Sequence, residues 1–425
     1  MRVIIIGGGI GGLTAALSLH AAGLNDIEIF EVSPEIKPLG VGINVLPHAC
    51  RELVELGLEE RLAETAISCQ RLVYSNAHGQ EIWSEPRGKA AGYHWPQFSI
   101  HRGELQMILL DAVLDRLGQG SVHFGDPLAS IETGERGATA IFRSGKRASA
   151  DVIVAADGIH SAARAQFYPT EGPPKWNRRI LWRGMTESDP FLGGATMVMS
   201  GHQAQKFVCY PISRETAARG RSLTNWIAEL EYPEEFAWRR EDWNRAGRLE
   251  DFLPQFESWA FGWLDVPGLI RNADRVFEYP MVDRDPVDRW TFGRTTLLGD
   301  AAHPMHPVGS NGASQAILDA RTLAFELATH ADVDEALAAY EVKRRSATGR
   351  IVLSNRGNGP EQVMQWAHER APGGFKAVED VLSREELEGV AANYKNIAGF
   401  SVSDLNNRPS LTTRERQPLG TAGEA

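Results

Sequence analysis

The stretch that decides the fold is Val3-Ile4-Ile5-Ile6-Gly7-Gly8-Gly9-Ile10-Gly11-Gly12, near the start of the chain. Its first part is short, β-branched and bounded by glycine, which is typical of a buried parallel strand. The segment from about Gly11 to Ala22 predicts a helix, and Ile27–Phe30 predicts a second strand that ends at Glu31. This order predicts a β-α-β unit at the start of the chain.

The glycines of this stretch have the spacing GxGxxG at Gly7, Gly9 and Gly12. The pattern alone is weak, because the chain has 42 glycines. Here it lies at a strand-to-helix junction, and an acidic residue, Glu31, ends the next strand, which is the context of a dinucleotide site. Gly7 permits a tight turn, Gly9 admits a pyrophosphate, and Gly12 lets the helix pack on the strand. Glu31 is expected to accept both hydroxyls of an adenosine ribose.

Two further motifs follow later apolar strands. Asp157-Gly158 comes directly after the predicted strand Asp151–Ala156, and Gly299-Asp300 comes after Thr295–Leu298. A carboxylate such as Asp300 at a strand end can accept hydrogen bonds from ribityl hydroxyls, which a flavin has and NAD lacks. Each motif alone could be an ordinary turn, but their order along the chain favours FAD.

A glycine-bearing turn opens the next predicted helix. The residues Gly309, Ser310, Asn311, Gly312 and Ala313 precede a stretch with helical periodicity from about 312 to 345. Its free N–H groups and dipole would meet the pyrimidine end of an isoalloxazine, where the reduced flavin carries negative charge.

Composition excludes several classes of protein. The 425-residue chain is 43% hydrophobic and 23% charged, which is ordinary for a globular enzyme. A net charge of −11 argues against nucleic acid or an anionic membrane as a partner. Its three cysteines, Cys50, Cys69 and Cys209, form no CxxC pair and no Cys/His metal pattern, so we expect neither disulfides nor a metal site. No signal peptide or membrane span is evident, and a cytoplasmic monomer or homodimer is expected.

Changes in local composition along the chain predict three structural regions. Residues 1–71, 97–169 and 290–360 carry the strand-ending motifs and form a discontinuous Rossmann-like domain. Residues 72–96 and 170–289 are rich in aromatic residues and arginine, and they predict an inserted, mostly β, substrate domain. Residues 361–425 form a C-terminal helical segment with a polar tail, Asn406–Ala425, that is expected to be disordered.

Together these motifs resemble the single-component FAD-dependent aromatic hydroxylases, the group of para-hydroxybenzoate and salicylate hydroxylases. The resemblance spans about residues 1–360 and implies an α/β fold with an FAD-binding domain of the GR2 type. Six further stretches are similar to the flavin monooxygenases of phenazine (pyocyanin) biosynthesis: Pro38–Asn44, Trp83–Gly88, Ser99–Gln106, Trp182–Gly184, Tyr279–Asp285 and Asn311–Ala316. That branch replaces the carboxyl of an N-methylated phenazine carboxylic acid with a hydroxyl. The chain departs from it near His306, where an aromatic residue is expected.

The resemblance also implies roles for individual residues. Arg102 and Gln106 should lie against the FAD, and Asp157 should serve both FAD and the nicotinamide. The family has no separate nicotinamide domain, and Glu31 is assigned to FAD, so NADH and NADPH stay equally open. The implied chemistry is reduction of FAD by NAD(P)H, capture of dioxygen as a C4a-hydroperoxide, and hydroxylation of a small aromatic acid.

Several residues are candidates for substrate contact or catalysis. Pro304 fixes the backbone of a loop expected beside the flavin, or it simply ends the turn. His306 is a candidate hydrogen-bond partner or base, against the alternative of a loop histidine satisfied by backbone. Arg183 could pair with a substrate carboxylate, or it could instead hold FAD or the domain interface. Tyr210 could line the pocket or pack the sheet.

Three other functions stay open from sequence. A fold-mate with different flavin chemistry, such as a reductase or a halogenase, is one, although the chain has no WxWxIP-type halogenase segment. A flavin-binding redox sensor is the second, but it would not need the aromatic-rich β domain. A nicotinamide dehydrogenase is the third, and the Gly299-Asp300 motif disfavours it.

Overall fold

The computed structural model describes residues 1–38, 40–238 and 245–413. Six strands form a mostly parallel sheet in the order β20-β21-β12-β1-β2-β8. β1 (Arg2–Ile6) pairs in parallel with β2 (Asp26–Glu31) and β12 (Val152–Ala155), and β12 pairs with β21 (Thr295–Leu297). The edges are β8 (Val122–Phe124) and the antiparallel β20 (Thr291–Phe292). The central strand β12 is entirely apolar, and β1 is apolar after Arg2, because other layers cover both faces of the sheet.

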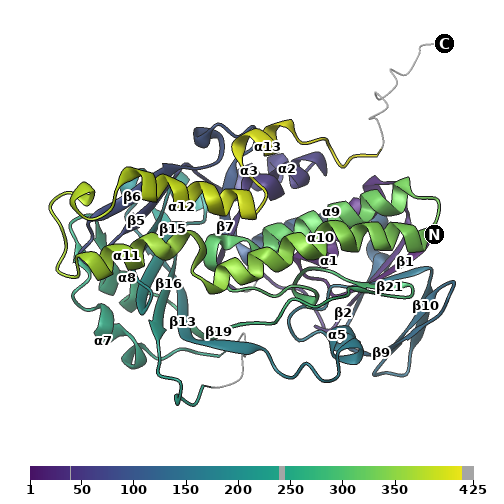
Figure 1. Ribbon diagram of the computed structural model, residues 1–425. Helices are drawn as coiled ribbons and strands as arrows, with labels where there is room; N and C mark the ends of the chain where they lie inside the picture. The colour runs from purple at the N-terminus through teal and green to yellow at the C-terminus, as the bar shows by residue number, and fades with distance from the viewer. Residues whose placement is uncertain (39, 239–244, 414–425) are drawn as a thin grey trace, which may run out of the picture.

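Helices cover one face of this sheet and a small sheet covers the other (Figure 1). The helical layer consists of α1 (Ile10–Ala21), α4 (Arg102–Leu117) and α9 (Gly312–Thr329). The opposite layer consists of β9 (Leu128–Thr133), β10 (Ala138–Phe142) and β11 (Arg147–Ala150). Phe142 of β10 stacks on Phe30 of β2, with ring centroids 4.4 Å apart. One continuous core therefore runs through all three layers.

The β-α-β unit predicted from sequence is confirmed, and its strand ends differ by one residue at most. The single periodic stretch predicted over 312–345 is wrong in one respect. Two helices occupy it, α9 and α10 (Val333–Arg356), and the helical conformation is interrupted between them near His330. Asp332 starts the second helix, because its carboxylate accepts hydrogen bonds from the Asp334 and Glu335 amides at 2.8 and 3.0 Å.

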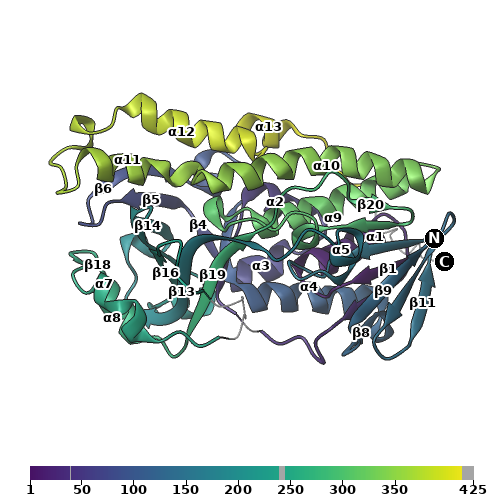
Figure 2. The same ribbon diagram turned by 60° about the horizontal axis from the view of Figure 1, so that its bottom comes forward.

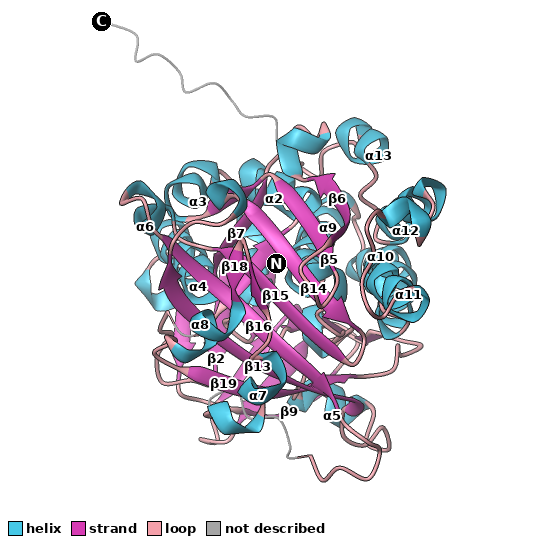
Figure 3. Cartoon of the chain, turned by 90° about the vertical axis from the view of Figure 1, so that its left-hand side faces the viewer, coloured by secondary structure: helices cyan, strands magenta, loops and turns pink. Residues whose placement is uncertain are grey.

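The second half of the molecule is a seven-stranded sheet in the order β19-β13-β16-β15-β14-β5-β6 (Figure 3). Its outer face packs under α7 (Leu253–Phe256) and α8 (Val266–Arg271) through an aromatic cluster that includes Trp182 and Phe252, stacked at 4.8 Å. Its inner face turns towards the parallel sheet. The strands are β5 (Arg71–Ser75), β6 (Glu81–Pro86), β13 (Lys175–Ser188), β14 (Thr196–His202), β15 (Gln205–Pro211), β16 (Ser222–Glu231) and β19 (Val276–Asp283).

Smaller elements connect the two halves. A three-stranded sheet has the order β3-β7-β4, and the remaining short elements surround the two main sheets. They are β3 (Gly42–Val45), α2 (Pro47–Glu55), α3 (Glu59–Thr65), β4 (Ile67–Cys69), β7 (Gln97–His101), α5 (Ala162–Phe167), α6 (Arg214–Ala218), β17 (Ala260–Phe261) and β18 (Leu264–Asp265).

The C-terminal helices lie along one side of both halves (Figure 2). They are α10, α11 (Gln362–Arg370), α12 (Arg384–Ile397) and α13 (Val402–Asn407). The expected disorder from Asn406 is wrong for the first part of the tail, since Asn406 donates to the Gly92 carbonyl at 2.9 Å and Thr412 donates to Glu55 at 3.2 Å. Residues 414–425 of that tail lie outside the described residues. No helix in the described part of the chain is long and apolar enough to cross a membrane.

Candidate active site

The glycines at the start of α1 form an open cradle. Gly7 has φ +107°, and a Cβ there would lie 2.4 Å from the Ala156 carbonyl oxygen. A Cβ at Gly12 would lie 2.0 Å from the Gly7 carbonyl oxygen, so the helix approaches the strand only because Gly12 lacks a side chain. Gly9 has no heavy atom within 4 Å of its Cβ direction. The helix N-terminus is therefore accessible to a pyrophosphate.

Glu31 and Gln106 hold this loop in place. The Gly8 amide donates to Glu31 Oε2 at 2.6 Å, and the Ser33 amide donates to Oε1 at 2.9 Å. Gln106 Nε2 donates to the Gly8 carbonyl at 2.8 Å. Each Glu31 oxygen keeps a further lone pair for a ribose hydroxyl.

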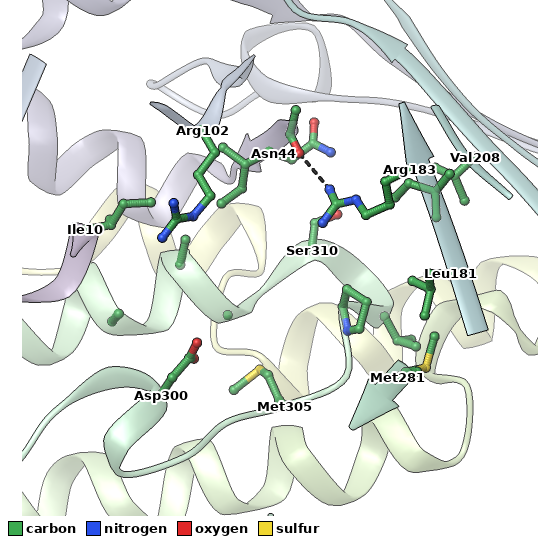
Figure 4. A pocket seen from close by; sticks show the side chains of 18 of the residues that line it. Ile10, Asn44, Arg102, Leu181, Arg183, Val208, Met281, Asp300, Met305 and Ser310 are labelled. Atoms are coloured by element: carbon green, nitrogen blue, oxygen red, sulfur yellow. Dashed lines mark hydrogen bonds between the residues drawn. The ribbon is translucent and has the colours of Figure 1, made fainter. Parts of the chain in front are cut away.

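One cavity of about 300 Å³ lies between the two halves and joins the predicted cofactor motifs to the inner face of the seven-stranded sheet. The first half contributes Gly9, Gly11, Arg102, Gly158, Gly299, Asp300, Gly312 and Ala313. The sheet contributes Leu181, Arg183, Met197, Met199, Val208, Tyr210, Ile227 and Met281. A polar, glycine-rich region thus continues directly into a mostly apolar one (Figure 4).

Asp300 and Arg102 point into this cavity (Figure 4). Burial raises the pKa of the Asp300 carboxyl, and His303 and Arg102 partly offset that effect. Burial lowers the pKa of the Arg102 guanidinium, and Asp300 opposes that change. Asp300 can therefore offer a hydrogen-bond acceptor to ribityl hydroxyls, and Arg102, on the facing side in Figure 4, can offer a cation to a phosphate or a flavin carbonyl.

The turn before α9 borders the same cavity. Gly309 has φ +67° and Ser310 φ +56°, and Gly312 and Ala313 at the start of α9 line the cavity. The Asn311 side chain turns away from solvent and donates to the Tyr394 hydroxyl at 2.9 Å.

Asp157 holds the start of α5. One of its oxygens accepts from the Ala162 amide at 2.7 Å and from the Ala163 amide at 3.3 Å. The other oxygen is buried and has no hydrogen-bond partner among the described residues. The neighbouring Gly158 lines the cavity, whereas Asp157 lies beside it. A cofactor contact by Asp157 stays a prediction.

In the loop after Asp300, the side chains that face the cavity are not the two expected from sequence, Pro304 and His306. Met305 and Pro307 line the cavity, whereas Pro304 and His306 are not among its lining residues. His306 is 2% exposed, and its Nε2 lies 3.5 Å from Asp283 Oδ2. Burial lowers the pKa of this imidazole. The buried position of His306 outside the cavity lining therefore argues against direct contact of its ring with a substrate.

Arg183 and Tyr210 lie at one end of the apolar part. Arg183 Nη2 donates to the Gly42 carbonyl at 2.8 Å, while its Nε is buried without a partner among the described residues. Tyr210 is 3% exposed, and burial raises its pKa to about 12 while Arg183 opposes that shift. A guanidinium and a neutral phenol at this point can hold a carboxylate.

Two groups of buried polar residues were missed from sequence. The first joins Asp319 of α9 to the Gly299-Asp300 turn: its carboxylate lies 2.5 Å from His303 Nε2 and accepts from the Gly299 amide at 3.1 Å. The second is Lys206, with Glu229 and Glu361, in the cavity wall. Period-two alternation of Lys206, Val208 and Tyr210 could have placed the lysine on the pocket face, but no local signal brings Glu361 to it.

These residues fit FAD. The cradle at Gly9, the cavity-facing Asp300 carboxylate and the N-terminus of α9 lie along one continuous cavity, which matches the pyrophosphate, ribityl and isoalloxazine parts of that cofactor.

Comparison with known proteins agrees with the site. A family model described as an FAD binding domain matches residues 1–242 and 270–354. The chain is 46% identical over 367 residues to phenazine 1,6-dicarboxylic acid hydroxylase from Lysobacter antibioticus, covering 83% of this chain and 89% of that protein. It is 29% identical over 366 residues to 3-hydroxybenzoate 6-hydroxylase 1 from Aquipseudomonas alcaligenes, covering 84% and 88%.

Solved structures share the fold. A salicylate hydroxylase substrate complex has a TM-score of 0.74 at 23% identity, covering 97% of this chain and 99% of that chain. HpxO from Klebsiella pneumoniae, complexed with FAD and uric acid, has a TM-score of 0.71 at 24% identity, covering 96% and 95%. FAD is thus the cofactor, and the chain belongs to the FAD-binding-domain family of flavin-dependent aromatic hydroxylases.

Proposed function

We propose that this enzyme hydroxylates a fused-ring heteroaromatic acid of the phenazine type, at the expense of NADH or NADPH and dioxygen. The observation that carries the proposal is the continuity of one cavity from Asp300 and α9 to an apolar sheet face that ends at Arg183. The 46% identity to a phenazine 1,6-dicarboxylic acid hydroxylase supports the ring system.

In this proposal FAD is bound mainly by residues of the glycine-rich region of the cavity. Gly7, Gly9 and Gly12 admit the pyrophosphate, Glu31 accepts from the adenosine ribose, and Gln106 fixes the loop. In the same proposal the ribityl and ring parts contact Arg102, Asp157, Gly299, Asp300, Gly309, Asn311, Gly312 and Ala313. FAD, when bound and reduced, supplies the oxygen-transfer chemistry, and the protein positions the ring and excludes water.

On the substrate side, methionines and aliphatic residues form a surface on which a flat ring can lie. Arg183 and Tyr210 hold the carboxylate at one end. Pro307 and Met305 close the wall beside the turn before α9. His306 acts as a positioning residue, because its carbonyl accepts from Asn355 Nδ2 at 3.0 Å and its ring is turned to Asp283.

The test is an assay of the FAD-loaded protein with NADH or NADPH in air. Phenazine-1-carboxylate, phenazine-1,6-dicarboxylate, an N-methylated phenazine carboxylate, salicylate and 3-hydroxybenzoate would each be incubated, and the products read by mass. A phenazine acid that gains one oxygen, or exchanges carboxyl for hydroxyl, supports the proposal. Oxygen transfer to the single-ring acids alone would contradict the proposed ring system.

A further inference from the structure

Three charged side chains form part of the apolar cavity wall. Lys206 of β15 and Glu229 of β16 are 6% and 2% exposed, and Glu361, which precedes α11, is 6% exposed. All three line the cavity. Burial of charge without function is costly, so charged groups in the wall of an apolar ligand cavity call for a physical explanation.

The lysine is shared between the two carboxylates. Lys206 Nζ lies 2.5 Å from Glu361 Oε2 and 3.0 Å from Glu229 Oε2. Burial alone would lower the pKa of this ammonium, but the two glutamates raise it above its ordinary value. An ammonium has three N–H donors, and these two contacts leave one of them available on a residue that faces the cavity.

Glu229 has an unused acceptor. Its Oε1 is buried and makes no hydrogen bond with any described residue, and the nearest cation on that side, Arg179 Nε, is 3.6 Å away. The cavity wall therefore offers one donor, on Lys206, and one acceptor, on Glu229, at adjacent positions. The two residues face each other in the ladder between β15 and β16.

The position of this pair relates it to the opposite polar end. Lys206, Val208 and Tyr210 alternate on one face of β15, so Tyr210 lies four residues, or about 13 Å, from Lys206 along the strand. Val208, Ile227 and Met199 fill the space between. The cavity floor is thus apolar in the middle and polar at both ends, a pattern that matches an elongated fused-ring ligand with a polar group at each end.

The charges at the two ends differ in kind. Arg183 supplies a cation for a carboxylate at one end. At the other end Lys206 and Arg179 already balance Glu229 and Glu361, so a carboxylate there would be an added negative charge close to two others, and like charges at short range repel. A neutral group with both a proton and a lone pair would instead satisfy both Glu229 and Lys206.

We propose that Lys206 and Glu229 form a second substrate subsite, which binds a neutral hydroxyl-bearing group, such as a phenol or a protonated carboxylic acid. This inference rests on the proposed function and deepens it. The substrate is a fused-ring aromatic acid with its carboxylate at Arg183 and a hydroxyl-bearing group at the opposite edge. Lys206 donates to the oxygen of that group, and Glu229 Oε1 accepts its proton in a hydrogen bond.

The experiment measures ligand binding to the FAD-loaded protein through the change in flavin absorbance. The probes are phenazine-1-carboxylate, 6-hydroxyphenazine-1-carboxylate and the 6-methoxy analogue of the latter. The variant is Glu229→Gln, which preserves side-chain volume and leaves the Lys206–Glu361 pair. The matched control is Glu231→Gln, which lies on the same strand and pairs with Arg178 outside the cavity.

We expect the wild-type protein to bind the hydroxy compound about tenfold more tightly than phenazine-1-carboxylate, and the methoxy compound no better than phenazine-1-carboxylate. Glu229→Gln should reduce the tenfold preference to near unity, and Glu231→Gln should retain it. The comparison of the hydroxy and methoxy compounds alone tests the subsite if Glu229→Gln does not fold.

Equal binding of the hydroxy and methoxy compounds by the wild-type protein would overturn the subsite. So would a preference that survives in Glu229→Gln. If the wild-type protein hydroxylates one of these acids and yet shows no such preference, the subsite fails while the proposed function stands. If it neither binds nor hydroxylates any phenazine acid, the proposed function fails, and the subsite with it.

Discussion

The Tyr394 hydroxyl lies directly beneath Gly309: a Cβ built on Gly309 would be 2.1 Å from Tyr394 Oη. This hydroxyl accepts from Asn311 Nδ2 at 2.9 Å and lies 3.2 Å from the Val308 carbonyl oxygen. Helix α12 of the C-terminal segment therefore fixes the turn that opens α9. Because that turn is the proposed contact for the flavin ring, the C-terminal segment controls the cofactor site from outside it.

Tyr394→Phe should weaken FAD binding without unfolding the protein. The substitution removes hydrogen bonds to the turn, each of which contributes about 1 kcal/mol, so the Kd for FAD is expected to rise about tenfold. Titration of the apoprotein with FAD measures this. Tyr93→Phe is the control, because Tyr93 donates to the Phe400 carbonyl at 2.6 Å in the same C-terminal cluster but does not contact the turn. Equal loss of FAD affinity in both variants would contradict the specific role of Tyr394.

Gly309→Ala should destabilise the protein by a steric conflict as well as by backbone strain. A left-handed conformation costs a non-glycine residue about 1–3 kcal/mol, and here the new methyl group also meets the Tyr394 hydroxyl. Gly145→Ala provides the matched control, since Gly145 has φ +87° but no heavy atom within 4 Å of its Cβ direction. Thermal unfolding should show the larger fall in Tm for Gly309→Ala, and similar falls would show that the contact with Tyr394 is unimportant.

His48 should make the fold sensitive to mild acid. Burial, with Arg408 and Arg344 nearby, lowers the pKa of this imidazole to about 3. In the unfolded chain the pKa is about 6.5, so below that pH the unfolded state binds a proton that the folded state does not. Stability is therefore full above about pH 6.5 and is lost progressively as the pH falls towards 3.

The magnitude of this effect is measurable. Between pH 7 and pH 5 the wild-type protein should lose about 2 kcal/mol from this group. His48→Gln, which can still accept from Gln315 Nε2, removes the titration and should flatten that part of the profile. Denaturant unfolding at the two pH values gives the comparison. A profile that is equally steep in the variant would assign the acid sensitivity to other groups.

Arg183→Met should weaken binding of the substrate carboxylate and leave FAD affinity unchanged. The expected loss is about tenfold in Kd for phenazine-1-carboxylate, with little change for phenazine-1-carboxamide, because only the acid carries the charge that Arg183 binds. Arg178→Met on the same strand is the control, since Arg178 pairs with Glu231 outside the cavity. If acid and amide lose affinity equally, Arg183 acts only through its hydrogen bond to the Gly42 carbonyl.

The sequence predicts those parts of the fold that depend on local patterns. The strand before Gly7, the helix after Gly12 and the strand ending at Glu31 follow from apolar runs and glycine spacing, and all three are present. The break at His330 was missed because helical periodicity continues through it, and only the cap at Asp332 marks it.

Contacts between residues that are distant in the chain could not be predicted from the sequence. Tyr394 contacts Gly309 from 85 positions further along the chain, and Glu361 contacts Lys206 from 155 positions further along, so no local sequence pattern indicates either contact. The residue type of His306 and its place after Pro304 suggest a substrate contact, but the direction of side chains along an irregular loop cannot be predicted from sequence. In the structure its ring turns to Asp283, while its two neighbours, Met305 and Pro307, line the cavity.

We propose that the protein transfers one atom of dioxygen to an aromatic acid bound between Asp300 and the seven-stranded sheet. The most direct measurement is incubation of the FAD-loaded protein with NADH, phenazine-1,6-dicarboxylate and ¹⁸O-labelled dioxygen, followed by mass spectrometry of the product. We expect a hydroxylated product in which the new oxygen carries the label. A product whose new oxygen comes from water, or NADH oxidation that yields only hydrogen peroxide and leaves every aromatic acid unchanged, would contradict it.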